Sequence, residues 1–337
     1  MQGTAREIWV LVDDRAGNAA QALGVAEALG LPFTVKTLAY TRAAALPNLI
    51  RGCGPMGLSP ASAAALVPAG GAWPLLAIAA GRRAAPPARW IRDSAARAGR
   101  ATALVQIMDP GWPGREDFDL IAVPVHDRHG LAGSNVLPIL GAPHRVTPER
   151  LAAARETWAG ILGETEDPRI ALLVGGASRK RPFTPERAAA LGRRTAALAR
   201  AVGGRIFLTT SRRTGRAAED ALVAALPQGS WIYRWGDPGE NPYFGLLAWA
   251  DAIVVTGDSM SMVSEACGAA VPVLIDAPAR ATAAKHARFH ARLYEARRAL
   301  PLSDDGEGLA AGMAGLDCLP LNSALDVARA VRDRGLV

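Results

Sequence analysis

The stretch "VVTGDSMSMVSEACGAAVPVLID", residues 254–276, reads as an apolar strand, a short helix and a second apolar strand. A strand, a helix and a parallel strand form the repeating unit of α/β sheets. A helix on such a sheet normally turns apolar side chains inward, yet this one begins with small and polar residues, namely Gly257, Asp258, Ser259, Ser261 and Glu265. The stretch therefore predicts an α/β fold and raises the question of what its polar helix start binds.

The same alternation extends through the rest of the chain. Short apolar runs such as "IWVLVDD", "LLAIAAG" and "LIAVPVHD" in the first half, and "RIALLVGG", "GRIFLTTS" and "DAIVVTG" in the second, are separated by Ala-rich helical stretches. This pattern is typical of parallel sheets with helices on both faces. We therefore expect two doubly wound, Rossmann-like α/β domains facing a central cleft, since such sheets bind ligands at the carboxyl ends of their strands.

A chain of 337 residues is longer than one hydrophobic core needs. We expect an N-terminal Rossmann-like domain over residues 1–145 and a linker helix and loop over 146–168, which ends in the polar segment "GETEDPR". A C-terminal Rossmann-like domain should occupy residues 169–320. The last segment, 321–337, should form a helix that can pack back on the N-terminal domain.

The composition restricts the classes of partner. The formal charge of +7 suits an anionic partner. The chain has no basic block interleaved with aromatic residues, so nucleic acid is not expected. Its cysteines, Cys53, Cys267 and Cys318, are far apart and form no CxxC pair, which argues against disulfides and structural zinc. With no signal-peptide pattern and no apolar run long enough to cross a bilayer, we expect a cytoplasmic protein whose basic surface leaves peripheral membrane contact open.

Three loops of the second half follow apolar strands: "GGASRKR" at 175–181, "TTSRRTG" at 209–215 and "TGDSMSMVSE" at 256–265. In a parallel sheet all three should open on one edge. Glycines admit an anion close to the backbone, helix N-termini offer free N–H groups, and hydroxyls and guanidinium groups add donors. The predicted diphosphate site comprises Gly175, Gly176, Ser178, Arg179, Thr210, Ser211, Arg212, Arg213, Gly257, Asp258, Ser259, Ser261 and Glu265.

Within the third loop, Ser261 and Glu265 are four residues apart and share a helix face. Each predicted residue also fits a simpler role on its own: Ser259 can be a helix cap and Arg212 an ordinary loop charge. The coincidence of three such loops at one predicted edge favours a nucleotide site.

The segment "TGDSMSMVSEACGAAVPVLID" resembles the donor-site segment of GT-B glycosyltransferases, particularly the UDP-N-acetylglucosamine transferase of peptidoglycan synthesis. Glu265 falls at the position whose carboxylate binds ribose in that family. Over nearly its full length the chain resembles the mitochondrial fission ELM family of glycosyltransferases, through "DDRAGNAAQALGVAEAL", "NVLPILGAPHRVTPERLAAA", "LLVGGASR" and "TTSRRT".

The resemblance implies a GT-B-like enzyme in which the second domain binds a nucleotide sugar and the first presents an acceptor. It implies an inverting, metal-independent transfer of a hexosyl or N-acetylhexosaminyl group, with no cofactor besides the nucleotide-sugar donor substrate. Its relatives with lipid-linked acceptors make such an acceptor, and a peripheral place at the inner face of the membrane, compatible with this chain.

The first half carries the candidate acceptor-side residues. In "DDRAGNAAQ" the residues Asp13, Asp14, Gly17, Asn18 and Gln21 surround a strand end and a helix start, without the GxGxxG pattern of dinucleotide sites. The resemblance directs this loop toward the acceptor, while a polar turn with an Asn cap explains it equally well. An inverting transferase needs a base near the acceptor hydroxyl, for which the candidates are His126 and Asp127 of "VPVHDRHG", then Asp13.

Two patterns could suggest a metal. Asp117 and Asp119 form a DxD, but they lead into a first-half strand and are interpreted as a turn. His286 and His290 lie four apart on the basic segment "KHARFHARL", without the carboxylate of an HExxH motif. We therefore expect no metal and interpret that segment as a basic helix that contacts an anionic substrate or solvent.

Two other functions stay open. A nucleotide-sugar epimerase shares the two-domain plan and needs no separate acceptor. A non-catalytic scaffold of GT-B fold would act through protein or membrane recruitment. The presence of Glu265 favours an active ligand site over the scaffold.

Overall fold

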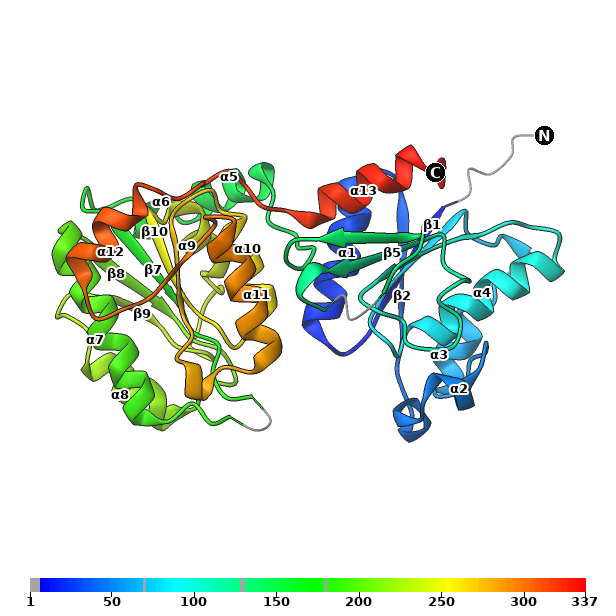
Figure 1. Ribbon diagram of the computed structural model, residues 1–337, viewed down its shortest axis with the longest axis horizontal. Helices are drawn as coiled ribbons and strands as arrows, with labels where there is room; N and C mark the ends of the chain where they lie inside the picture. The colour runs from blue at the N-terminus through cyan, green and yellow to red at the C-terminus, as the bar shows by residue number, and fades with distance from the viewer. Residues whose placement is uncertain (1–6, 69–70, 128–130, 179–180) are drawn as a thin grey trace. The chain divides into compact units, whose positions relative to one another are not determined.

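The computed structural model describes residues 7–68, 71–127, 131–178 and 181–337. The chain divides into two compact units (Figure 1): unit 1 is Met1–Arg145 with Ser323–Val337, and unit 2 is Val146–Asn322. Each unit contains one six-stranded sheet whose paired strands are all parallel. The predicted α/β class with two doubly wound, Rossmann-like domains is confirmed.

The sheet of unit 1 has the strand order β2-β1-β3-β4-β5-β6. Its strands are β1 (Ile8–Val12), β2 (Phe33–Thr37), β3 (Leu76–Ala80), β4 (Ala103–Ile107), β5 (Leu120–Pro124) and β6 (Val136–Ile139). Its helices include α1 (Ala16–Leu29), α2 (Asn48–Arg51), α3 (Pro60–Ala65), α4 (Ala85–Arg97) and α13 (Ser323–Asp333), with 3-10 turns η1 (Arg42–Ala45) and η3 (Val125–Asp127).

Successive side chains of β1 pack into two different hydrophobic clusters of unit 1. Ile8 and Val10 pack in one buried cluster with residues of α1 and α13, whereas Trp9 and Leu11 pack in another with residues of α4. Successive side chains of a strand point to opposite faces, so an all-apolar strand requires helices on both sides. The final helix α13 lies beside α1 in Figure 1, and the Ser323 hydroxyl donates to the Leu140 carbonyl over 2.7 Å.

The sheet of unit 2 has the order β12-β11-β10-β7-β8-β9. Its strands are β7 (Arg169–Leu173), β8 (Arg205–Thr209), β9 (Trp231–Tyr233), β10 (Ala252–Thr256), β11 (Val273–Asp276) and β12 (Leu300–Pro301). Its helices are α5 (Pro148–Thr157), α6 (Ala159–Leu162), α7 (Pro185–Val202), α8 (Arg216–Ala224), α9 (Tyr243–Trp249), α10 (Met260–Cys267), α11 (Ala284–Glu295) and α12 (Gly306–Met313), with the 3-10 turn η4 (Ala279–Ala281).

Helices again cover both faces of the unit 2 sheet. Helices α7, α8 and α12 pack together over one buried cluster (Figure 1), while α9 packs on β7 and on α5. The segment 146–168 therefore belongs to unit 2, where its helices α5 and α6 contact α9. The stretch 254–276 forms the end of β10, then α10, then β11, and β10 pairs with β7 on its other side.

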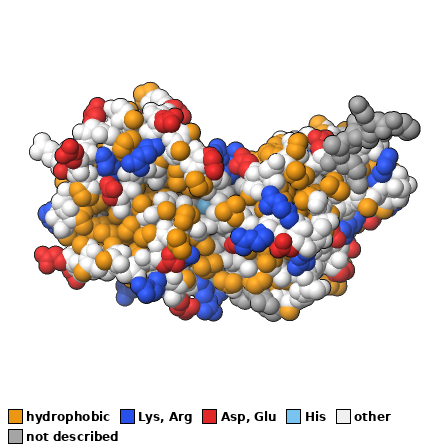
Figure 2. Space-filling view, turned by 90° about the horizontal axis from the view of Figure 1, so that it is seen from above, with side chains coloured by type: hydrophobic (Ala, Val, Ile, Leu, Met, Phe, Trp, Pro, Cys, Tyr) orange, Lys and Arg blue, Asp and Glu red, His pale blue; other side chains and the backbone are white. Residues whose placement is uncertain are grey.

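The basic side chains can be followed on one face of the molecule. On the face shown in Figure 2, Lys and Arg side chains are scattered among hydrophobic and neutral ones rather than gathered in one patch. Among the described residues, no helix combines the length and apolar character that a bilayer crossing requires.

Candidate functional site

The turn after β7 is the centre of the candidate site in unit 2. The Gly175 N–H donates to the Thr256 hydroxyl over 2.8 Å, and the Gly175 carbonyl accepts from the Thr214 hydroxyl over 2.7 Å and from the Ser211 hydroxyl. The Gly176 N–H donates to the Asp258 carboxylate over 3.2 Å. The loops that follow β7, β8 and β10 are thus joined directly to one another at the carboxyl edge of the sheet.

The two glycines are required by the closeness of these loops. Gly176 has a φ of +138°, and a Cβ at this position would lie 2.2 Å from the carbonyl oxygen of Arg213. A Cβ on Gly175 would lie 2.5 Å from a carboxylate oxygen of Asp258. Glycine alone permits this backbone conformation and this approach without strain. The "GG" of the sequence therefore serves the contact between loops, and it leaves a small-residue surface there.

Asp258 and Arg213, both predicted to bind the donor, contact each other. Arg213 Nη1 lies 2.7 Å from Asp258 Oδ2, and the Asp258 side chain is only 7% exposed. The Arg213 backbone also pairs with Ala177, whose N–H donates to the Arg213 carbonyl over 2.8 Å. Arg212 is exposed and has no hydrogen bond or ion pair with another described residue. Arg212 is accordingly the guanidinium of this loop that is available to a ligand.

The hydroxyls of the second loop divide into two roles. Thr210 is buried, donates to Glu219 over 2.6 Å and accepts from the Trp235 N–H over 2.8 Å. Ser211 bonds Gly175, as described, and its hydroxyl also accepts from the Arg213 N–H over 3.2 Å. These predicted donor residues hold the loop in place, together with Thr214 and Thr256, which the prediction did not include. Thr256 is the last residue of β10 and Thr214 lies in the loop after β8, so their places within the predicted loops 209–215 and 256–265 were the available signal for them.

Helix α10 begins at this edge. The Ser259 hydroxyl accepts from the Met262 N–H over 3.4 Å, as an N-cap does, and the first turn carries no acidic residue. The Gly257 N–H donates to the Asp276 carbonyl over 2.9 Å. Unpaired N–H groups and the positive end of the helix dipole favour an anion here. Ser261 is partly exposed on the first turn.

Glu265 lies one turn further along α10 and is mostly buried. Its Oε2 accepts a hydrogen bond of 2.6 Å from the Tyr243 hydroxyl, and its Oε1 has no hydrogen bond with another described residue. Burial raises the pKa of Glu265, and the bond from Tyr243 opposes that rise. A carboxylate that keeps one unpaired oxygen can accept from a ligand hydroxyl. Sequence reasoning missed Tyr243, because no local pattern links it to Glu265.

The remaining part of the first loop is only partly described. The Ser178 N–H donates to the Arg181 carbonyl over 2.9 Å. Arg179, also predicted, lies outside the described residues.

In unit 1 the residues predicted on the acceptor side gather around Arg83. Arg83 Nη2 lies 2.8 Å from Asp13 Oδ2 and also contacts Asp14, whose side chain is 76% exposed. The hydrogen bond from Arg83 lowers the pKa of Asp14. The Asn18 amide donates to Asp13 over 3.4 Å. Asp13 is therefore held as a carboxylate paired with Arg83 and Asn18.

The other predicted residues of unit 1 lie in separate places along the same edge. Gly17 begins α1 partly exposed, and Gln21 is 6% exposed on the next turn. His126, 5% exposed, and Asp127, half-buried, lie in η3 after β5. Asp13 and Asn18 are the pair among these residues that direct hydrogen bonds join.

The acidic DxD pair is engaged by arginines. Asp117 pairs with Arg89 and Asp119 with Arg92, and Asp117 lies in a turn before β5. Among the described residues, no group of three or more His, Cys, Asp or Glu side chains is arranged to hold a metal ion.

Comparison with known proteins identifies relatives over most of the chain. The model of the family described as mitochondrial fission ELM1 matches residues 16–335. A Rickettsia prowazekii protein, the uncharacterized RP120, is 27% identical over 86% of this chain and 88% of its own length. The mitochondrial fission protein ELM1 of Arabidopsis thaliana is 27% identical over 60% of this chain, and the match spans 51% of that protein.

Solved structures share the fold at low sequence identity. The UDP-GlcNAc 2-epimerase of Methanocaldococcus jannaschii has a TM-score of 0.57 at 13% identity, covering 98% of this chain and 100% of that one. The Neisseria meningitidis UDP-GlcNAc 2-epimerase bound to UDP-GlcNAc has a TM-score of 0.55 at 11% identity, covering 98% and 99%. MurG of Acinetobacter baumannii has a TM-score of 0.50 at 13% identity, covering 98% and 100%. At such identities the likeness concerns the fold.

Proposed function

The chain belongs to the mitochondrial fission ELM1 family, and from this membership and the loops of unit 2 we propose that it is a nucleotide-sugar-dependent glycosyltransferase. Unit 2 binds the donor at the carboxyl edge of its sheet. The transfer is of the inverting, metal-independent kind, and the group transferred is a hexosyl or N-acetylhexosaminyl group.

The observation that carries the proposal is the joining of three strand-end loops around Gly175. Their hydroxyls and the Asp258 carboxylate form the hydrogen bonds that hold the loops together, and these bonds keep the start of α10 in a fixed place. Preorganised N–H donors stabilise developing negative charge effectively because they need not reorient. The start of α10 and the exposed Arg212 would stabilise the leaving diphosphate, while Glu265 Oε1 accepts from a ribose hydroxyl.

The transfer itself requires an acceptor hydroxyl and a base. The acceptor oxygen attacks the anomeric carbon, its proton passes to the base, and the nucleoside diphosphate leaves with the bonding electron pair. The candidates for the base are His126, Asp127 and Asp13 of unit 1. Of these, Asp13 is the weakest candidate because its carboxylate is already engaged by Arg83.

The proposed setting is the cytoplasm, with a lipid-linked acceptor and peripheral contact with the membrane as the most specific form of the proposal. At low salt the protein is expected to sediment with anionic vesicles and to be recovered in the pellet. Recovery in the supernatant would remove the membrane part of the proposal and leave the donor site untouched.

A second candidate function is a nucleotide-sugar epimerase. It is raised by the UDP-GlcNAc 2-epimerases among the solved structures that share the fold. An epimerase would convert the nucleotide sugar without an added acceptor, so product analysis in the absence of acceptor distinguishes the two reactions.

The donor site is tested by calorimetric titration with UDP, GDP, ADP, CMP and their sugar conjugates. One nucleotide is expected to bind saturably, and Glu265→Ala and Arg212→Ala are each expected to weaken it by about tenfold or more, which corresponds to at least ~1.4 kcal/mol. Addition of EDTA is expected to leave this binding unchanged.

Matched controls come from the opposite edge of the same sheet. Glu166 is exposed just before β7 and Arg200 is exposed in the last turn of α7, so Glu166→Ala and Arg200→Ala remove the same charges away from the site. Both controls should bind as the wild type does. Absence of binding by any of the nucleotides would contradict the proposal and favour a non-catalytic scaffold.

A further inference from the structure

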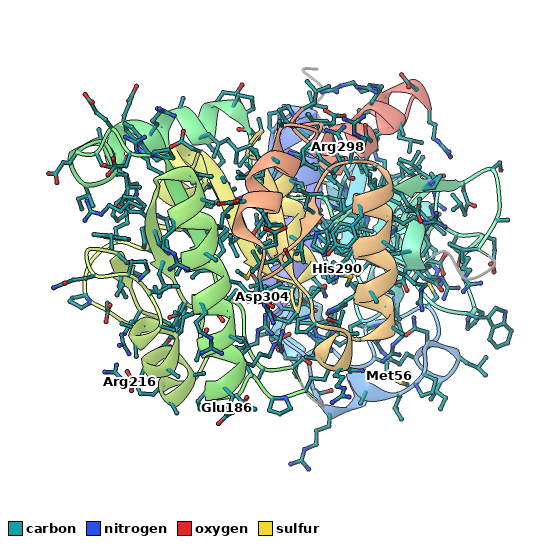
Figure 3. The ribbon with its side chains drawn as sticks, turned by 60° about the vertical axis from the view of Figure 1, so that its left-hand side comes forward. Met56, Glu186, Arg216, His290, Arg298 and Asp304 are labelled. Atoms are coloured by element: carbon teal, nitrogen blue, oxygen red, sulfur yellow. The ribbon has the colours of Figure 1, made fainter. Side chains whose placement is uncertain are left out.

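Helix α11 carries a buried histidine with no assigned role. Its inward side chains are Phe289, His290 and Leu293, and His290, labelled in Figure 3, is 2% exposed. Neither ring nitrogen of His290 has a hydrogen-bond partner among the described residues. Buried polar groups are nearly always hydrogen-bonded, so an imidazole left without partners requires a reason.

The ring of His290 lies against the turn that begins α10. A Cβ added to Gly257 would lie 2.5 Å from His290 Cε1, 3.0 Å from His290 Nε2 and 2.9 Å from the Cβ of Ala277. Gly257 is therefore the residue that admits the imidazole under this turn. The turn is the one whose N–H groups, in the proposed function, receive the diphosphate, so His290 directly underlies the proposed anion site.

The surroundings of His290 keep it neutral without a ligand. Burial, the largest cause, and His286, one turn earlier on α11, together lower its pKa to about 4. The backbone of Gly257, close to the ring but outside hydrogen-bond geometry, and the Asp258 carboxylate act in the opposite direction. Lys285 and Arg181 add positive charge near His286. From β11, the buried carboxylate of Asp276 is already paired with Arg194 at 2.8 Å.

We propose that His290 takes up a proton when the diphosphate of a nucleotide sugar binds at the start of α10, and that this uptake strengthens binding as the pH falls. The proposal rests on the proposed function and names a positioning residue for its donor site. The ligand brings about two negative charges to the turn that covers the ring, which favours the imidazolium. The imidazolium in turn gives the turn a positive charge beneath the diphosphate.

The sign of the pH dependence follows from the direction of the proton. Without ligand the pKa of His290 is about 4, and in the complex it is higher. Above the pKa of the complex the affinity does not depend on this group. Between that pKa and about 4, the affinity rises as the pH falls, by at most about tenfold per pH unit for one proton.

The test is calorimetry of the whole chain with UDP-, GDP- and ADP-linked sugars, whose diphosphate diesters do not titrate near neutral pH. Measured at about pH 6 in two buffers of different ionisation enthalpy, the heats should reveal uptake of up to about one proton per bound ligand. His290→Gln should bind without proton uptake and with an affinity that no longer changes with pH. His286→Gln, altered one turn away on the same helix, should keep the uptake.

A second measurement needs no variant at this position. The Cε1 proton resonance of His290, followed against pH by NMR, should titrate at a higher pH with the nucleotide sugar than without it. Binding by the wild type with no proton uptake and an unshifted His290 titration overturns the inference and leaves the proposed function standing. Failure of every nucleotide sugar to bind overturns the proposed function, and the inference with it.

Discussion

The carboxyl edges of the two sheets are built differently, although both sheets are parallel and six-stranded. In unit 1 the strand-end charges are paired: Asp13, with a side chain 2% exposed, contacts Arg83 at 2.8 Å. In unit 2 the loops after β7, β8 and β10 meet through backbone groups and hydroxyls around Gly175, and ion pairs join Arg213 to Asp258 and, at the end of β11, Arg194 to Asp276.

The difference shows how an edge can be made available to an anion. Ion pairs between acids and guanidinium groups satisfy the charges of the unit 1 edge within the protein. Around Gly175, hydrogen bonds from hydroxyl and backbone groups join the loops of unit 2. These bonds do not use Arg212 or the start of α10, which stay available to a ligand. The proposed donor site accordingly lies in unit 2, and the following variants test whether each edge is held as described.

The largest effect is expected from the close approach of loops in unit 2. Gly176→Ala should lower the free energy of unfolding by about 3 kcal/mol or more, because its Cβ would lie 2.2 Å from the Arg213 carbonyl oxygen. Gly203→Ala, at a left-handed φ of +64° with open space around it, is the control and should cost about 1 kcal/mol. Urea unfolding measures both. Equal costs for the two variants would mean that the loops can separate without penalty.

The next effect tests the ion pairs of unit 1. Arg83→Met should cost about 3 kcal/mol, because it leaves the buried Asp13 carboxylate without its guanidinium partner. Arg97→Met removes a surface pair with Asp93, whose side chains are 76% and 51% exposed, and should cost less than about 0.5 kcal/mol. If thermal unfolding shows the same loss of stability for both variants, the ion pair of Arg83 does not hold the unit 1 edge.

A smaller effect concerns the bond between Tyr243 and Glu265. Tyr243→Phe should cost about 1 to 2 kcal/mol at pH 8, because an ionised, mostly buried carboxylate loses its donor. Since burial raises the pKa of Glu265 above 4.5, this group makes folding less favourable as the pH rises through its folded pKa. The bond opposes that rise, so the variant should lose stability more steeply than the wild type as the pH rises above 4.5.

Denaturation of both proteins across that pH range makes the comparison. Tyr233→Phe, which removes a hydroxyl that donates to the Asp237 carbonyl over 3.1 Å, provides a control with no carboxylate partner. Parallel curves of stability against pH for Tyr243→Phe and the wild type would show that the Tyr243 hydroxyl does not stabilise an ionised Glu265 carboxylate.

The smallest effect is expected at the start of α10. Ser259→Ala removes the hydroxyl that accepts from the Met262 N–H and should cost about 1 kcal/mol, whereas Ser259→Gly should cost only a few tenths. Both substitutions should leave nucleotide binding within about threefold, since the N–H groups of the turn are backbone groups. A loss of binding without a loss of stability would instead place the Ser259 hydroxyl on the ligand.

The sequence predicted the fold because its signals are local. The buried strand β1, for example, is predicted from five consecutive apolar residues, and the polar start of α10 is predicted from the residues directly after Thr256. The family resemblance placed Glu265 on that helix, a position that the structure retains. The donor role of each predicted residue remains a prediction that the nucleotide titrations test.

The partners of these residues could not be predicted from local pattern. Gly176 and Asp258 are 82 positions apart in the chain, and Tyr243 and Glu265 are 22 apart. Nothing in "TGDS" indicates that its aspartate accepts a hydrogen bond from the Gly176 N–H. Similarly, the motif "KHARFH" suggested a basic helix facing a substrate or solvent, whereas His290 is buried beneath Gly257.

The sequence by itself determined that this chain forms two parallel α/β sheets and that polar loops end the strands of the second. Hydrophobic periodicity and turn residues act over a few positions, and they suffice for that much. Only the tertiary structure decided which polar groups are used up within the protein and which stay available, because pairing depends on loops that meet after the sheet has formed. Asp258 is bound to its neighbours, whereas Arg212 has no hydrogen bond or ion pair with another described residue, and this division decides what the proposed donor edge offers a ligand.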